Sequence, residues 1–262
     1  KRGQKQVCLH FAEREYLRRS QRFGKFREND RLRPRHAPFG GKRLVKMRKE
    51  YVSTPGEECA NAVTHGVMAL AALPALPFAA VWTYGHAPAD RVAAAAAVSL
   101  FVISMFLMFL ASTLYHAMEP QTRHKRVFRV LDHIGIYVAI AGSYTPVALV
   151  VLGGWQGVLV TALQWVAVLL GILCKTLSRR ERPALSLTVY LVMGWSILLF
   201  FPLFLRHASA PLIVLIAAGG VCYTLGAWVY AVQGFRYHHM VWHLMIDLAV
   251  AAHFAGIVFF LY

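Results

Sequence analysis

The hydrophobic residues of this chain gather into seven long runs that begin at about residue 60, whereas the first 50 residues are mostly polar. Each run is close to the roughly 20 helical residues that cross the hydrocarbon core of a membrane. We therefore predict an all-α polytopic integral membrane protein, folded as a bundle of seven transmembrane helices. The expected spans are about 60–83, 91–116, 131–151, 155–176, 184–205, 211–233 and 239–261.

Composition agrees with the hydrophobic pattern. Hydrophobic residues make up 58% of the 262 residues and charged residues only 15%, which is typical of a membrane protein rather than a soluble domain. The four cysteines have no metal-ligand or disulfide spacing, so neither a thiolate site nor a disulfide framework is predicted. They are Cys8, Cys59, Cys174 and Cys222.

The positive charge is concentrated at the start of the chain. Residues 1–50 hold 17 Lys and Arg against 5 Asp and Glu, whereas the net charge of the whole chain is +16. We divide the chain into a basic tail, residues 1–50, and a membrane domain, residues 51–262. The tail is predicted to be disordered, cytoplasmic and attracted to anionic lipid headgroups. Nucleic-acid binding is the alternative that we do not favour, and Met47 as the native start, with an upstream extension before it, is a further possibility.

Basic residues in the connections predict the orientation of the bundle. They follow the second, fourth and sixth spans, whereas the opposite links hold only Arg91 and Arg206 at their edges. Because Lys and Arg favour cytoplasmic loops, we expect a cytoplasmic N-terminus and an external C-terminus. The connecting basic residues are Arg123, Lys125, Arg126, Arg129, Lys175, Arg179, Arg180, Arg182 and Arg236.

Two histidines at the start of the last span form a candidate half-site for a metal. His239 and His243 stand four residues apart, so in a helix both imidazoles share one face. An interfacial or packing role is the alternative for such a pair. Ser112 and His116 have the same spacing at the end of the second span, and Asp132 is expected at the start of the third.

By topology these three positions lie at the same cytoplasmic end of the bundle. Ionisable groups inside a bilayer are costly, which favours a functional role for them. Three protein ligands and a water form an open, catalytic zinc site, so His116, His239 and His243 are predicted to bind Zn²⁺. In the alternative reading each polar group only hydrogen-bonds a neighbouring helix.

A polar stripe at the entrance of the first span lies at positions i, i+3 and i+7. Glu58, Asn61 and His65 are predicted to hold the outer ring nitrogens of the ligating histidines, and an amphipathic cap in the headgroups is the alternative.

Asp247, one turn beyond His243, could orient a ligand, gate protons or bond a neighbouring helix. His253 is expected to pack between helices. Five histidines near helix ends or loops are expected to be solvated: His86, His124, His133, His207 and His238.

Four ordered motifs carry a resemblance to a known family. They are Glu58-x-x-Asn61-x-x-Thr64-His65, Ser112-x-x-x-His116, Leu131-Asp132-His133-Ile134-Gly135 and His239-x-x-x-His243. From about Tyr51 to Tyr262 the chain resembles the hemolysin III proteins, which belong with the progestin and adiponectin receptors and the alkaline ceramidases. The resemblance implies a bacterial member with seven helices and zinc near the cytoplasmic face, bound at His116, His239 and His243. It also implies that Ser112 and Asp132 lie beside the zinc-bound water.

Receptor and ceramidase relatives imply hydrolysis of a lipid amide, whereas the hemolysin III name refers to lysis of red cells. We therefore expect an inner-membrane (plasma-membrane) zinc hydrolase of a lipid amide or acyl bond, with Asp132 accepting a proton from water and Ser112 steadying the water or the oxyanion. Two alternatives stay open: a non-enzymatic sensor or regulator of membrane lipid state, and a pore-forming hemolysin.

A retinal-type pump is excluded because no lysine follows Lys175. G-protein coupling is disfavoured by the cytoplasmic N-terminus. Membrane lipids are the expected partners, and the oligomeric state is open.

Overall fold

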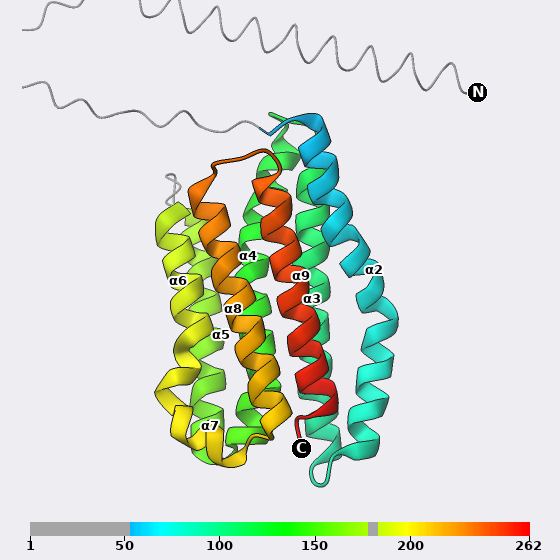
Figure 1. Cartoon of the computed structure of the whole chain (residues 1–262), viewed down its shortest axis with the longest axis vertical. Helices are drawn as coiled ribbons and strands as arrows, with labels where there is room; N and C mark the ends of the chain where they lie inside the picture. Colours follow the sequence, from blue (N-terminus) through cyan, green and yellow to red (C-terminus); the bar gives the residue numbers. More distant parts are fainter. Residues whose placement is uncertain (1–52, 178–182) are drawn as a thin grey trace, which may run out of the picture. The chain divides into compact units, whose positions relative to one another are not determined.

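The computed structural model describes residues 53–177 and 183–262, and all regular secondary structure in those two ranges is helical. Seven helical segments are long and apolar enough to cross a membrane, which confirms the predicted seven-helix membrane fold (Figure 1). The basic tail lies outside the described residues. The helices are α2 (Pro55–His86), α3 (Arg91–Ala117), α4 (Arg123–Pro146) with its π-helical end η2 (Val147–Leu152), α5 (Gly154–Leu177), α6 (Pro183–Trp195), the 3₁₀ segment η3 (Ser196–Phe200), α7 (Phe201–His207), α8 (Ala210–Val232) and α9 (His238–Phe259).

The first span begins five residues before its expected start, because the sequence Thr54-Pro55-Gly56-Glu57 forms a capping box. The Glu57 N–H donates to Thr54 Oγ1 at 3.3 Å, and Glu57 Oε2 accepts from the Thr54 N–H at 2.7 Å. Proline at the first helical position is favourable because its missing N–H has no intrahelical partner there. The cap therefore places Glu57 and Glu58 in the first turn of α2.

The third span also begins earlier than the hydrophobic pattern predicted. Helix α4 starts at Arg123 rather than at about residue 131, because the side chain of Thr122 caps it by accepting from the Lys125 N–H at 3.1 Å. The basic segment that was expected to be a loop thus forms the first two turns of α4. Asp132 consequently lies in the third turn of that helix and not at its start.

Two spans have irregular segments inside the bundle. The third span changes from α-helix to π-helix after Pro146, and the fifth is divided into α6, η3 and α7. The Tyr144 hydroxyl compensates the second break by donating to the Gly194 carbonyl at 2.7 Å and accepting from the Ile197 N–H at 2.8 Å. Such partners are required because lipid offers no hydrogen bonds to exposed backbone.

The helices that carry the candidate metal ligands pack directly against one another. Helix α2 contacts both α3 and α9. The starts of α2, α4 and α9 and the end of α3 lie at one end of the bundle, opposite the C-terminus (Figure 1). Large buried side chains fill the core below that end, among them Phe101, Phe109, Leu212 and Ile257. The polar residues predicted from three separate motifs are thereby brought to one level.

Candidate metal site

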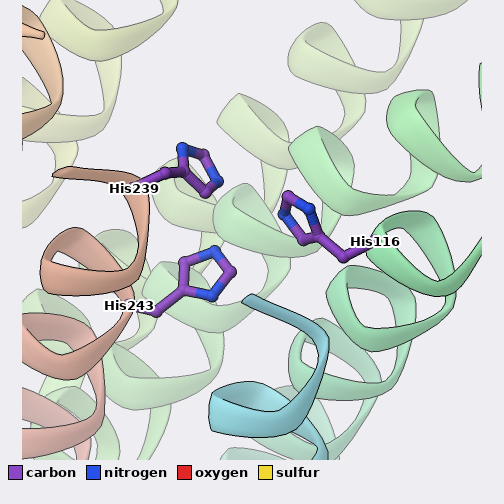
Figure 2. A group of neighbouring side chains, drawn as sticks. All are labelled: His116, His239 and His243. Carbon is purple, nitrogen blue, oxygen red and sulfur yellow. The ribbon is translucent and has the colours of Figure 1, made fainter. Parts of the chain in front are cut away.

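Three imidazoles converge between α3 and α9. His116 comes from the last turn of α3, and His239 and His243 come from the first two turns of α9 (Figure 2). Each offers a ring nitrogen, and these nitrogens all lie within 4.8 Å of one another. His116 and His243 are buried and His239 is half-buried. We call these three residues the candidate metal site, because the group could hold a metal ion.

The chemistry of the donor set fits a metal. The Nδ1 atom of His116 lies 3.2 Å from Glu58 Oε2, and its Nε2 atom is buried with no hydrogen-bond partner among the described residues. The His243 Nδ1 atom lies 3.2 Å from the Asn61 carbonyl oxygen. Metal-ligating histidines usually have the outer ring nitrogen held by such oxygens, which leaves the other nitrogen directed at the metal. Imidazole ligands suit Zn²⁺ and several other transition metals.

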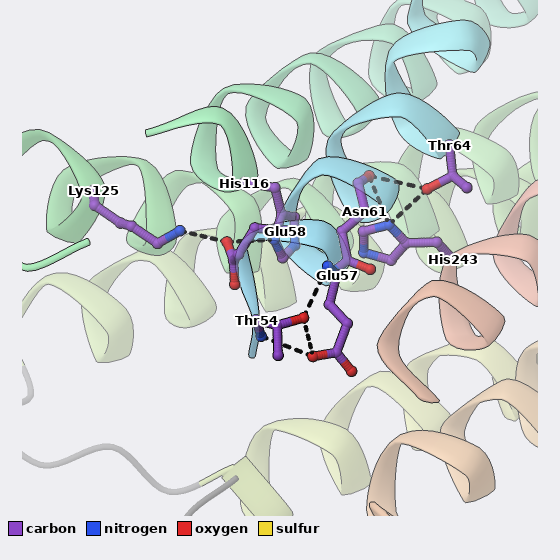
Figure 3. Close-up of polar contacts among 8 residues, drawn as sticks. All are labelled: Thr54, Glu57, Glu58, Asn61, Thr64, His116, Lys125 and His243. Carbon is purple, nitrogen blue, oxygen red and sulfur yellow. Dashed lines mark hydrogen bonds and ion pairs between the residues drawn. The ribbon is translucent and has the colours of Figure 1, made fainter. Parts of the chain in front are cut away.

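The polar stripe of α2 supplies these outer contacts (Figure 3). Glu58 Oε2 accepts from both His116 Nδ1, at 3.2 Å, and Lys125 Nζ, at 2.5 Å. Asn61 acts through its main-chain carbonyl, whereas its side-chain amide is buried without a hydrogen-bond partner among the described residues. Thr64 Oγ1 lies 3.2 Å from His243 Nδ1 and donates to the same Asn61 carbonyl at 2.9 Å.

A second polar layer lies one helical turn deeper. The ring of His65 stacks on that of His243 with 3.6 Å between centroids, and His65 Nε2 lies 3.7 Å from Asp247 Oδ1. His65 is only 2% exposed, so it is inside the bundle and does not belong to a cap facing lipid headgroups. Asp247 therefore faces His65 and not a member of the candidate metal site directly.

The two predicted catalytic residues are placed differently. Ser112 is buried one turn before His116 on α3, and its hydroxyl has no hydrogen-bond partner among the described residues. Asp132 Oδ2 lies 3.8 Å from His133 Nδ1. No hydrogen bond or ion pair joins Asp132 to the candidate metal site within the described part of the chain. Ser112 thus lies one turn from His116 on the same helix, whereas the ion-pair contact of Asp132 is with its neighbour His133.

Of the histidines expected to be solvated, one is not. His86, His124 and His207 are exposed and His133 is half-buried, but His238 is only 4% exposed. That prediction was wrong for His238 because α9 begins at this residue, and its Nδ1 atom lies 3.1 Å from the Phe235 carbonyl oxygen in the preceding turn.

Three residues that shape the site were not predicted from the sequence. Glu57 is 2% exposed, and its Oε1 atom accepts from the Tyr237 N–H at 2.9 Å, which ties the start of α9 to the start of α2. The Thr-x-x-Glu spacing of a capping box was the available signal. Thr64 belongs to the first of the four motifs, but no contact was predicted for it. Lys125 was predicted only to lie in a cytoplasmic connection.

An apolar cavity of about 220 Å³ lies between the helices, and its wall includes residues of α9. Trp242 and Ile246, which flank His243 on α9, belong to its wall, as does Met108, one turn before Ser112. Most of the remaining wall comes from α4, α8 and the broken fifth span, including Tyr144, Gly194, Trp195, Ile197, Phe201 and Ala217, and His253 of α9 also belongs to it. We call this space the apolar cavity.

Comparison with known proteins gives consistent matches over the membrane domain. A family model described as "Haemolysin-III related" matches residues 54–254. "Hemolysin-3" of Bacillus cereus is 33% identical over 204 residues, which cover 78% of this chain and 91% of that protein. "Hemolysin-3 homolog" of Bacillus subtilis (strain 168) is 33% identical over 78% of this chain and 94% of its own length. The human "Monocyte to macrophage differentiation factor" is 26% identical over 81% of this chain and 87% of its own length.

Proposed function

The chain belongs to the haemolysin III-related family of multi-pass membrane proteins, and on this premise we propose that it is a zinc-dependent hydrolase of a lipid amide or related acyl bond. The proposal includes a location in the plasma (inner) membrane, with the candidate metal site toward the cytoplasm. One observation supports it: three imidazoles have nitrogens within 4.8 Å of one another, and α9, which carries two of them, also contributes to the wall of an apolar cavity.

The proposed cofactor is Zn²⁺, held by His116, His239 and His243. Zinc with three protein ligands supplies a Lewis acid and makes water acidic enough to lose a proton near neutral pH. The Glu58 carboxylate and the Asn61 carbonyl orient two of the imidazoles by accepting from their Nδ1 atoms, each at 3.2 Å. Neutral imidazole ligands leave the full charge of the ion available for this chemistry.

The remaining residues of the proposed mechanism act on water and substrate. Ser112 has a buried, unpartnered hydroxyl that can donate to a substrate oxygen as negative charge develops on it. Asp132 is the proposed proton acceptor, and its half-buried carboxylate now faces His133. Catalytic hydrogen bonds are often formed only once substrate is bound, which is compatible with this separation.

The apolar cavity supports a lipid as the substrate. Its wall is formed almost entirely by aliphatic and aromatic side chains, which suit an acyl chain and exclude a charged or sugar-like ligand. Trp242 and Ile246 connect that wall to the turn of α9 that carries His243. The proposal places an acyl chain in the cavity with its polar end toward the candidate metal site.

Metal analysis and lipid turnover test the proposal together. Protein purified in mild detergent should contain about one Zn²⁺ per chain and should hydrolyse a member of a panel of lipid amides and esters. His239→Ala should lose both properties, whereas His86→Ala, an exposed histidine at the other end of α2, should keep both. Wild-type protein without zinc, or a His239→Ala variant with unchanged metal and turnover, would contradict the mechanism.

A non-enzymatic lipid sensor is the second candidate, and one observation favours it. The described wall of the apolar cavity includes Trp242 and Ile246 but none of the three histidines, and His116 Nε2 is inaccessible to solvent. In a sensor, zinc would only tie α3 to α9. Purified protein that contains zinc but turns over no member of the lipid panel would support this candidate over the hydrolase.

A further inference from the structure

A lysine from the basic segment at the start of α4 contacts Glu58, one of the outer contacts of the candidate metal site. Lys125 is in the first turn of α4, directly after the reversal of the chain between α3 and α4. Gln121 makes that reversal with a positive φ of 67°, and Thr122 caps the new helix. The short, capped turn directs Lys125 back toward the first turn of α2. Its side chain is only 14% exposed.

The ammonium group of Lys125 has two partners there. Its Nζ atom donates to Glu58 Oε2 at 2.5 Å, and it lies 4.7 Å from the centre of the Tyr115 ring (Figure 3 shows the first contact). The same Glu58 oxygen accepts from His116 Nδ1 at 3.2 Å. Lys125, Glu58 and His116 therefore form one hydrogen-bonded network across α4, α2 and α3.

The negative charge of Glu58 in this network determines which nitrogen of His116 carries the proton. A carboxylate beside Nδ1 favours the tautomer with hydrogen on Nδ1, so Nε2 keeps its lone pair for a metal. Glu58 can hold that position only while its own negative charge is compensated, because a partly buried carboxylate is poorly solvated. Lys125 supplies the compensating charge. Arg123 and Arg126, in the same turn of α4, are exposed.

We infer that Lys125 is a positioning residue for the metal site: it holds the Glu58 carboxylate against His116 Nδ1 and so keeps His116 Nε2 available as a ligand. The inference rests on the metal site proposed above. It adds a residue from the third span to a site whose ligands come from the second and seventh spans. It also assigns a role to one member of a basic segment that the sequence pattern used only to predict membrane orientation.

Zinc affinity, measured by competition with a chelator in detergent, tests this role. Lys125→Met should weaken Zn²⁺ binding by about tenfold, as outer contacts to ligating histidines do. Glu58→Ala should weaken it at least as much, and the double variant should bind no more weakly than Glu58→Ala, because Lys125 acts through Glu58. Lys125→Arg, which keeps the cation, should recover most of the affinity. Arg126→Met removes the same charge from an exposed neighbour and should leave affinity unchanged.

Several outcomes would overturn the inference. Lys125→Met with the affinity of Arg126→Met would show that Lys125 has no role at the site, and additive losses in the double variant would show that it does not act through Glu58. Thermal unfolding of the chelated proteins reports any general loss of stability, and Lys125→Gln replaces Lys125→Met if the latter does not fold. Wild-type protein that binds no zinc would overturn the proposed function as well, whereas tight wild-type binding with an unaffected Lys125→Met would overturn this inference alone.

Discussion

Around the candidate metal site, buried and half-buried polar side chains from α2, α3, α4 and α9 contact one another, whereas beside the apolar cavity the Tyr144 hydroxyl bonds the main chain at a break in the fifth span. Glu58 bonds both His116 and Lys125, but Tyr144 bonds the main chain at Gly194 and Ile197. The two regions share α9, which carries His243 toward the first and His253 toward the second. Polar residues in the first region thus surround a histidine group that could hold a metal ion, and Tyr144 in the second supports the backbone.

Replacing one histidine in each region gives the largest expected contrast. His116→Ala should weaken Zn²⁺ binding by more than about 100-fold, because outer contacts alone are worth 10- to 100-fold and this change removes a ligand. His253→Leu should leave zinc binding intact, since the hydrogen-bond partner of His253 Nε2 among the described residues is the Ile216 carbonyl, at 3.3 Å, and not a member of the candidate metal site. Zinc content after dialysis measures both, and equal losses would contradict the separation of the two regions.

The hydroxyl of Tyr144 tests the backbone repair beside the cavity. Tyr144→Phe leaves the Gly194 carbonyl and the Ile197 N–H without their partner, which should destabilise the fold by about 2 kcal/mol. The thermal unfolding midpoint should fall while zinc content stays at the wild-type level. Tyr84→Phe, at an exposed position of α2, is the control and should not shift the midpoint. An unshifted midpoint for Tyr144→Phe would show that the break needs no such support.

Filling the apolar cavity should affect substrate and not metal. Ala217 lines the cavity, so Ala217→Phe should lower turnover of a long-chain lipid by about tenfold, the scale on which pocket volume discriminates substrates. Ala218→Phe, at the next and exposed position of α8, should have little effect. Zinc content should be unchanged in both. Equal turnover by the two variants would argue against the cavity as the acyl-chain site.

The smallest effect is expected from Thr64, which shares its contact with a main-chain group. Thr64→Val removes the hydroxyl that lies 3.2 Å from His243 Nδ1, but the Asn61 carbonyl remains at 3.2 Å from the same atom. Zinc affinity should fall by less than about tenfold, the lower end for outer contacts. Thr64→Ser, which keeps the hydroxyl, should match the wild type. A loss as large as that of His116→Ala would mean that Thr64, and not the Asn61 carbonyl, orients His243.

Regular spacing explains what could be predicted from the sequence. The seven spans follow from hydrophobic run length, and the meeting of His116 with His239 and His243 follows from helix periodicity and the alternation of spans. Side-chain caps were the main source of error at helix ends: Thr54 and Thr122 start α2 and α4 earlier than hydrophobicity indicates. That shift moved Asp132 into the third turn of α4.

Details that depend on packing between helices could not be predicted. Nothing in the spacing of Asn61 indicates that its carbonyl, and not its amide, contacts His243. Lys125 resembles its neighbours Arg123 and Arg126 in sequence, and only the tight turn at Gln121 and Thr122 distinguishes it. The break in the fifth span, whose residues Trp195, Ile197 and Leu198 line the cavity, lies in a run that is hydrophobic apart from Ser196 and shows no helix-breaking residue.

X-ray absorption at the zinc K-edge of the purified protein tests the central claim most directly. The account predicts three imidazole nitrogens and one further oxygen at about 2.0–2.1 Å from zinc, with the imidazole signal reduced in any zinc that His239→Ala retains. Absence of zinc would contradict the account, and so would a sulfur ligand at about 2.3 Å or a fourth protein nitrogen in place of the oxygen.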